Sequence, residues 1–295
     1  MSNIKFHSPA SLNEAVRLLG GLKDARVLAG GTDLLVDIKE GLTEVKNLIS
    51  IQDLPGLERI ERVGDRLKIG ARITPREIAA DPHIQQHLPA LAEAAGTMAS
   101  SHIRSMATIG GNITSAVPSA DLPPPLIAAG AAVELACSVG TREVSLAEFF
   151  TGPRRTVCAG AEILTFVQIP LPPSGTGACF QRFSLRESNA LAVASVAAQL
   201  SLKDDKIEKA AVVLGAVAPT PLRAEKATQY LVGKSCSDDL FARAAALARE
   251  ECRPISDLRG SIWFRREIVQ VLAQRALAEA AARARTKHSN TRART

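Results

Sequence analysis

Apolar and polar positions in the first hundred residues alternate between helical and strand-like spacing. After Ser11, a favoured N-cap residue, Leu12 and Leu19 lie at helical spacing, and this run stops at Gly20-Gly21. Short apolar runs further on predict strands, and two segments have the spacing of helices. We expect strands at 26–29, 47–51 and 66–70 and helices at 73–80 and 88–95.

The pattern changes after residue 170. A segment rich in Pro and Gly, Pro170–Gly177, separates two apolar runs and is the best linker in the chain. Beyond it, the runs 192–202 and 207–217 are separated by Lys203-Asp-Asp-Lys206, which predicts an antiparallel hairpin with a charged turn. Before the linker we expect a helix at 121–129 and strands at 132–137 and 163–169, and after the hairpin helices at about 223–231, 238–252 and 260–285. We therefore expect two α+β halves that meet near 172–176.

The composition is that of an ordinary globular protein, with 46% hydrophobic and 22% charged residues among 295. No run of apolar residues approaches the 18 that a transmembrane helix needs, and the first residues lack the apolar core of a signal peptide. The five cysteines are odd in number and scattered, which indicates reduced thiols. We expect a cytoplasmic protein.

The formal net charge of +6 is concentrated at the end of the chain. After Glu279 there is no acidic residue, whereas five basic residues follow it: Arg283, Arg285, Lys287, Arg292 and Arg294. Without these five, 31 basic residues face 30 acidic ones, and the chain has only one Trp and one Tyr on which bases could stack. We expect no nucleic-acid partner, and we interpret 283–295 as a basic, disordered tail.

Two double-glycine segments are the strongest local signal for a binding site. Ala29-Gly-Gly-Thr-Asp33 follows a predicted strand, and Thr108-Ile-Gly-Gly-Asn112 repeats the theme. Glycine allows positive φ and close approach of a ligand, and successive exposed amides form a concavity that suits a phosphate oxygen. Two such loops face to face can hold a pyrophosphate, although two ordinary turns would have the same spacing.

Other motifs for nucleotide binding, metal binding or catalysis are incomplete or absent in the sequence. The Gly175-Thr-Gly177 segment lacks the third glycine of a Rossmann fingerprint, and Gly233-Lys-Ser235 lacks the first glycine of a phosphate-binding loop. His83 and His87 have no third ligand nearby, so they favour surface histidines over a metal site. There is no Cys-x-x-Cys and no Gly-x-Ser-x-Gly. We expect no metal site and no catalytic acid, base or nucleophile in this chain.

Taken together, four ordered motifs resemble the FAD-binding medium subunit of the molybdenum hydroxylases, the xanthine dehydrogenase and carbon monoxide dehydrogenase flavoprotein family. They are Val27–Leu35, Ala107–Asn112, Ser119–Pro124 and Leu214–Arg223. The resemblance implies an α+β fold with a PCMH-type, vanillyl-alcohol-oxidase-like FAD-binding domain at 1–173, in subdomains of about 1–55 and 56–173. A smaller domain with an antiparallel sheet and helices, similar to the carbon monoxide dehydrogenase flavoprotein C-terminal domain, would follow at 177–282.

The resemblance also implies which residues bind the cofactor. One glycine motif would wrap the FAD pyrophosphate and the other would complete the cradle, with amides rather than basic side chains as donors. Asp121 would contact the cofactor through a hydroxyl or the adenine, and Leu164 through an apolar surface. Near the flavin, Gln181 takes the place of the family's lysine, with Arg182 beside it. The implied set is Leu28, Ala29, Gly30, Gly31, Thr32, Asp33, Leu34, Leu35, Thr108, Ile109, Gly110, Gly111, Asn112, Asp121, Leu164, Gln181 and Arg182.

The function implied by the resemblance is electron transfer within a larger oxidoreductase. Noncovalent FAD in this chain would receive electrons from [2Fe-2S] clusters of a small subunit and pass them to an external acceptor. The molybdenum cofactor would lie in a large subunit, and the complex would be a dimer of heterotrimers. Two alternatives stay open: a self-contained flavin oxidoreductase on the same fold, and a non-catalytic assembly subunit.

Overall fold

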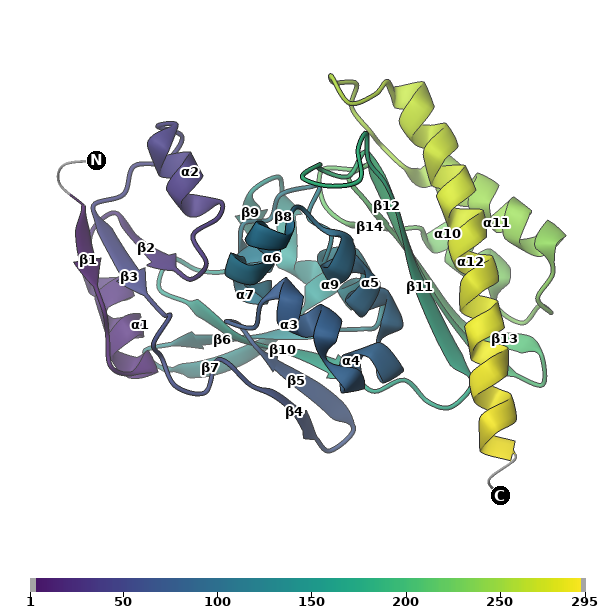
Figure 1. The fold of residues 1–295 in the computed structure, drawn as a ribbon, viewed down its shortest axis with the longest axis horizontal. Coiled ribbons are helices and arrows are strands. Elements are labelled where there is room, and N and C mark those ends of the chain that lie inside the picture. The colour runs from purple at the N-terminus through teal and green to yellow at the C-terminus, as the bar shows by residue number, and fades with distance from the viewer. Residues whose placement is uncertain (1–3, 293–295) are drawn as a thin grey trace.

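The computed structural model describes residues 4–292, with side chains described as far as residue 286, and builds the chain around three main sheets (Figure 1). The first sheet is parallel, with strand order β1-β3-β2. It is formed with two helices from the elements β1 (Lys5–His7), α1 (Leu12–Gly21), β2 (Ala25–Leu28), α2 (Leu34–Lys39) and β3 (Asn47–Ser50).

The second sheet is antiparallel, with strand order β4-β5-β10-β6-β7, and seven helices accompany it. Its strands and the small β8–β9 pair are β4 (Ile60–Val63), β5 (Arg66–Gly70), β6 (Ala132–Cys137), β7 (Gly140–Ser145), β8 (Phe150–Gly152), β9 (Arg155–Thr156) and β10 (Ile163–Pro170). The helices are α3 (Pro75–Ala80), α4 (Pro82–His87), α5 (Pro89–Thr97), α6 (Ser101–Met106), α7 (Ile109–Thr114), α8 (Pro123–Ala128) and α9 (Leu146–Phe149).

The third sheet, also antiparallel, has strand order β11-β12-β13-β14, and the long helix α12 packs against β11 and β12. Figure 1 shows α12 beside α10 and α11, at the opposite end of the molecule from the first sheet. The elements are β11 (Thr176–Phe183), β12 (Ala194–Lys203), β13 (Lys206–Gly215), β14 (Leu222–Arg223), α10 (Glu225–Leu231), α11 (Asp238–Glu251) and α12 (Ile262–Arg292).

The strands and helices expected at the ranges given above are present in the structure, most within a few residues of their expected ends, although α12 runs on to Arg292 instead of ending at 285. The Ser11 side chain caps α1 by accepting a hydrogen bond from the Glu14 amide, as the N-cap pattern indicated. The 203–206 turn joins β12 to β13, with Leu202 opposite Ile207. The mixed α+β class is confirmed. Among the described helices, none has the length and hydrophobicity to cross a bilayer.

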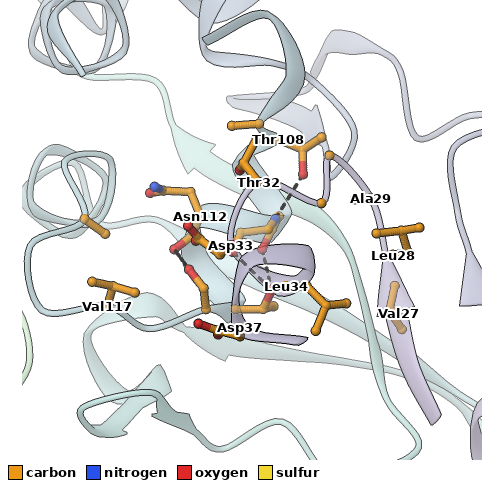
Figure 2. A pocket seen from close by; sticks show the side chains of 18 of the residues that line it. Val27, Leu28, Ala29, Thr32, Asp33, Leu34, Asp37, Thr108, Asn112 and Val117 are labelled. Carbon is orange, nitrogen blue, oxygen red and sulfur yellow. Dashed lines mark hydrogen bonds between the residues drawn. The ribbon is translucent and has the colours of Figure 1, made fainter. Parts of the chain in front are cut away.

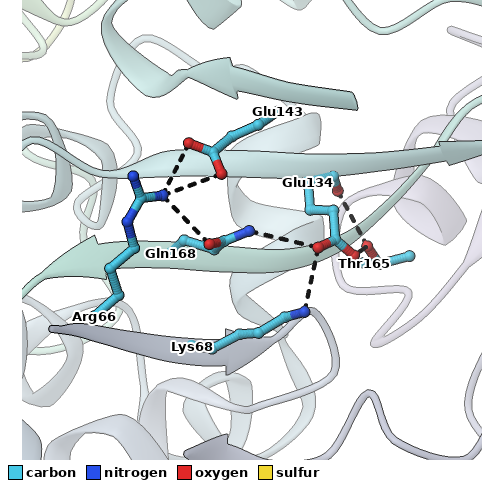
Figure 3. A network of polar contacts seen from close by, with 6 residues as sticks. All are labelled: Arg66, Lys68, Glu134, Glu143, Thr165 and Gln168. Atoms are coloured by element: carbon cyan, nitrogen blue, oxygen red, sulfur yellow. Dashed lines mark hydrogen bonds and ion pairs between the residues drawn. The ribbon is translucent and has the colours of Figure 1, made fainter. Parts of the chain in front are cut away.

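The second sheet shows how alternation places apolar residues on one face and polar residues on the other. Leu67, Ile69 and Val167 are buried on the helix-covered face. On the opposite face Lys68 and Gln168 both contact the Glu134 carboxylate, at 3.2 and 3.4 Å (Figure 3). The same face carries a bridge from Arg66 to Glu143 at 2.9 Å, and Thr165 donates to Glu134 at 2.8 Å. The basic and acidic side chains on this polar face therefore pair with one another.

The third sheet joins the rest of the molecule through a shared core. Phe180 and Val213 from the third sheet belong to the same apolar cluster as Leu91 in α5 and Leu126 in α8. At Gly177 a Cβ atom would overlap the backbone of Ala280 and Ala284 in α12, so glycine there lets the strand touch the helix. The two halves are therefore packed over a continuous interior.

The end of the chain departs from the expectation of a disordered basic tail. Helix α12 continues to Arg292, and Ala284 is fully buried in the core that α12 shares with α11. Arg283 pairs with Glu93 at 2.6 Å, and Arg285 pairs with Asp205 at 2.8 Å. The expectation is wrong for residues 283–286, because carboxylates distant in sequence neutralise these arginines. The side chains of Lys287 and Arg292, and all of Arg294, lie outside the described residues.

Candidate cofactor site

A cavity of about 890 Å³ lies where the first sheet meets helices α6 and α7. Its walls come from three separate parts of the chain: the β2–α2 segment, the α5–α8 region with β10, and the tip of the β11–β12 hairpin. Figure 2 shows Thr32 and Asp33 among the same lining side chains as Thr108 and Asn112. Both double-glycine segments therefore line the same cavity.

The first glycine segment supplies free backbone donors. Gly31 has φ of +70°, and a Cβ atom at Gly30 would overlap the carbonyl of Met106, so both positions require glycine. The amides of residues 30–33 have no hydrogen-bond partner among the described residues, and Asp33 does not cap α2 with its side chain. Consecutive unpaired amides at a loop and helix start make a concavity for an anion.

The second glycine segment differs from the prediction. It follows helix α6 rather than a strand, and Gly110 and Gly111 form the first turn of α7 with Thr108 as N-cap. Its amides are already paired: Gly110 donates to Ala71 at 3.0 Å and Gly111 to the Thr108 hydroxyl at 3.1 Å. The reading of this motif as a second strand-to-turn unit is wrong, because two short helical turns leave no periodic signal in the sequence.

Two buried side-chain oxygens lie in the cavity wall: Asp121 Oδ1 is ion-paired with Arg182, and Asn112 Oδ1 has no hydrogen-bond partner. Buried polar atoms are rarely left this way unless a ligand or water completes them. Burial raises the pKa of the Asp121 carboxyl to about 6, although Arg182, whose Nε lies 3.2 Å from Oδ1, opposes the rise. These oxygens suit hydroxyl or N–H donors of a ligand.

The charges around the cavity do not form a basic patch. Arg26 and Arg154 line it, but Arg154 is neutralised by Asp37 at 2.5 Å. The acidic side chains in the lining outnumber these two arginines; they are Asp33, Asp37, Asp121 and Glu162. An anionic ligand here must therefore be held chiefly by the amides of the first glycine segment.

Most of the expected site residues line the cavity. Those in the wall are Leu28, Ala29, Gly30, Gly31, Thr32, Asp33, Leu34, Thr108, Gly110, Gly111, Asn112, Asp121 and Leu164. Four lie outside it: Leu35 is exposed, Ile109 is in the core, Gln181 donates to the Cys179 thiol at 3.4 Å, and Arg182 lies behind Asp121.

Sequence reasoning missed the third wall of the cavity. Met98 and Ala99 follow α5, and Asn189, Ala190 and Leu191 lie at the tip of the β11–β12 hairpin. Ala99 and Asn189 both have positive φ, and the Asn189 amide donates to the Ala99 carbonyl at 3.0 Å. No local motif marks these residues, because only the packing of the two halves brings them to the cavity.

The cavity contains no obvious reactive group. Burial raises the pKa of the Cys158 thiol in its wall to about 11, so this thiol is neutral near pH 7. All five cysteines are free, and no three metal-binding side chains gather anywhere in the part of the chain that is described.

Comparisons with known proteins identify the class. Residues 2–172 match the FAD binding domain in molybdopterin dehydrogenase, and residues 179–280 match the CO dehydrogenase flavoprotein C-terminal domain. The carbon monoxide dehydrogenase medium chain of Afipia carboxidovorans is 34% identical over 95% of this chain and 97% of its own length. The xanthine dehydrogenase FAD-binding subunit of Escherichia coli O157:H7 is 30% identical, with 95% and 96% covered.

Solved structures agree with these relatives. A carbon monoxide dehydrogenase from Hydrogenophaga pseudoflava superposes with a TM-score of 0.92 at 34% identity, covering 95% of this chain and 98% of that one. This chain belongs to the family of FAD-binding medium subunits of the molybdenum hydroxylases. It is a flavoprotein and an oxidoreductase subunit, and its relatives are named as medium chains or FAD-binding subunits of multi-subunit enzymes.

Proposed function

We propose that this chain binds FAD noncovalently in the cavity and transfers electrons inside a molybdenum-containing hydroxylase or dehydrogenase. The observation that carries the proposal is the row of free amides at residues 30–33, at a cavity whose wall also holds the unpartnered Asn112 Oδ1 and the buried Asp121 carboxylate. Donors for a pyrophosphate and acceptors for hydroxyls thus occur in one site. These residues fit FAD.

The backbone amide donors and the side-chain oxygen acceptors would bind different parts of FAD. The amides of Gly30 to Asp33 bind the pyrophosphate, with the Thr32 hydroxyl beside them. The buried carboxylate of Asp121 would repel a phosphate, so it accepts from an uncharged hydroxyl or N–H of FAD instead. Leu164, which is 4% exposed in the cavity wall, supplies an apolar contact. Leu28 and Ala29 position the first loop.

FAD, when bound, accepts electrons from one redox partner and delivers them to another. The chain's own residues hold the cofactor and exclude water from part of it. The substrate is oxidised elsewhere: a large subunit carries the molybdenum cofactor, and a small subunit carries [2Fe-2S] clusters that supply the electrons. We propose a dimer of heterotrimers, in which this chain contributes a FAD-binding domain at 1–173 and a second domain at 177–282.

An exposed apolar cluster supports a partner on this chain. Ile255 and Leu258 lie in the segment that precedes α12, and Ile262 and Trp263 lie in its first turn, with exposed fractions of 69%, 103%, 43% and 67%. Exposed clusters of this kind on a globular protein mark interaction surfaces. We name these four residues the α12 patch and assign it to the interface with another subunit of the complex.

Isolation of the natively expressed, tagged chain tests the proposal. We expect flavin absorbance bands in the isolated protein, or after addition of FAD, together with two further chains that carry molybdenum and iron–sulfur centres. Protein that stays colourless with excess FAD would contradict the cofactor assignment and favour a non-catalytic assembly subunit. A flavin-loaded chain that comes alone and turns over a small substrate would instead indicate a self-contained flavin oxidoreductase.

A further inference from the structure

Arg182 occupies an unusual position at the junction between the two halves. It lies in β11, yet its side chain reaches Asp121, which precedes α8 in the first half. The Nε and Oδ1 atoms are 3.2 Å apart, and both side chains are only 7% exposed. A buried ion pair at a junction is costly to form unless its remaining donors are satisfied. The other acceptors of the Arg182 guanidinium therefore show which segments of the chain this ion pair connects.

The guanidinium satisfies its other donors with two backbone carbonyls. One nitrogen donates to the carbonyl of Thr97, the last residue of α5, at 2.9 Å. The other donates to the carbonyl of Ala190 at the tip of the β11–β12 hairpin. A planar, forked donor can bridge three separated acceptors in this way, whereas the single ammonium of lysine has a different geometry.

We propose that Arg182 is a positioning residue for FAD, which holds the Asp121 carboxylate and the 189–191 segment in place on the cavity wall. Asp121, Asn189, Ala190 and Leu191 all line the cavity, whereas Arg182 does not. Arg182 therefore acts through residues that reach the cofactor. The inference rests on the proposed contact between Asp121 and FAD. It adds that this contact depends on Arg182.

The electrostatic part of this role follows from burial. Loss of hydration favours the neutral form of Asp121, and among the charged groups of the described residues Arg182 is the one that opposes it. Arg104, on the adjacent α6, instead donates to the Met98 carbonyl at 2.8 Å. Arg182 thereby keeps a larger fraction of Asp121 ionised near pH 7, and an ionised carboxylate accepts hydrogen bonds more strongly.

The mechanical part concerns the hairpin tip. Its Asn189 amide donates to Ala99 of the first half, and its Ala190 carbonyl accepts from Arg182 of β11, whose guanidinium also contacts the first half. Only the Ala190 contact uses a side chain. Loss of Arg182 should therefore loosen the tip as well as change the charge of Asp121, and the two effects are separable by experiment.

The pH dependence of FAD binding to the full chain tests the electrostatic part. We expect wild-type affinity to weaken as the pH falls through about 6, where Asp121 becomes protonated. In Arg182→Gln the midpoint should move to higher pH by about one to three pH units, and Arg182→Lys should restore most of this shift. Arg283→Gln is the matched control, since Arg283 bridges the same junction to Glu93 outside the cavity.

Hydrogen exchange tests the mechanical part. Protection of the Asn189 amide should fall in Arg182→Gln but stay unchanged in Asp121→Asn and in Arg283→Gln. If Arg182→Gln does not fold, Arg182→Lys must still loosen Asn189 while it keeps the wild-type midpoint. An unmoved midpoint in Arg182→Gln, or the same shift in Arg283→Gln, overturns the inference. If Asp121→Asn leaves FAD affinity and its pH dependence unchanged, the proposed Asp121 contact fails instead.

Discussion

At the level of single residues, glycine has different tasks in the two motifs. Gly30 and Gly31 shape a loop whose amides stay free, whereas Gly110 lets α7 approach the backbone of Ala71 closely. At Gly111 a Cβ atom would meet the Thr108 hydroxyl at 3.0 Å, with no other atom within 4 Å. Gly111 therefore borders the open cavity, and Gly110 belongs to the packing beneath it.

This difference gives opposite expectations for two neighbouring substitutions. In Gly110→Ala the new Cβ lies 2.8 Å from Ala71 Cβ and 2.9 Å from its carbonyl oxygen, so the free energy of unfolding should fall by about 1–3 kcal/mol. Gly111→Val should retain most of the stability but weaken FAD binding about tenfold or more, because the side chain enters the cavity. Thermal unfolding without FAD and an FAD titration of both variants separate the effects; reversed results would refute this placement.

Asp121 predicts a pH dependence of stability without FAD. Its pKa of about 6 in the folded chain lies above the ordinary value, so the folded state binds the proton more tightly. Its contribution to stability is therefore complete below about pH 4 and is lost as the pH rises through about 6. Urea unfolding of the FAD-free protein between pH 4 and 7.5 should show this decline, and Asp121→Asn should remove it. If the free energy of unfolding changed equally with pH in the wild type and in Asp121→Asn, the prediction would be contradicted.

At the level of helices and strands, periodicity predicted the longest elements but only some of the short ones, such as α3 and α8. The ten-residue strands β12 and β13 and the fourteen-residue α11 follow from spacing and turn chemistry. The six-residue helices α2, α6 and α7 do not, since one or two turns contain too few apolar positions. For this reason the local setting of the second glycine motif was not predictable.

Helix α12 also extends further than its charge pattern indicated. Truncation before Arg283 removes the Glu93 bridge and the buried Ala284, so the free energy of unfolding should fall by about 2 kcal/mol or more. Truncation after Thr286 keeps both contacts and should change stability by less than about 0.5 kcal/mol. Denaturant unfolding of the two shortened chains measures this difference. Equal free energies of unfolding would mean that residues 283–286 do not stabilise the fold.

Considered as a whole, the molecule places its cavity where three distant parts of the chain meet, and the α12 patch lies at the start of the terminal helix. Asp37 and Arg154 also join separate parts of the cavity wall, from α2 and from the β8–β9 turn. The apolar cluster shared by the third sheet, α5 and α8 fixes the relative position of the walls. The shape of the cavity therefore depends on contacts between the two halves of the chain.

The α12 patch can be tested with a charge substitution. Trp263→Glu should weaken association with the partner subunits about tenfold or more, because a charge in an apolar interface loses hydration without gaining a partner. FAD affinity should stay unchanged, since Trp263 does not line the cavity. Val139→Glu is the control: Val139 is 93% exposed between β6 and β7. Equal co-isolation of both variants with the partners would show that the patch lies elsewhere than the interface.

Local sterics explain what could be inferred from the chain alone. Caps, turns, alternation and paired glycines depend on neighbouring residues, so the hairpin, the helix starts and the two glycine motifs were visible in the sequence. The partner of Arg182, the covering of the cavity by Asn189 to Leu191, and the neutralisation of Arg283 by Glu93 were not. These contacts join residues about sixty to two hundred positions apart, and only the packing of a shared core, which no local pattern encodes, brings them together.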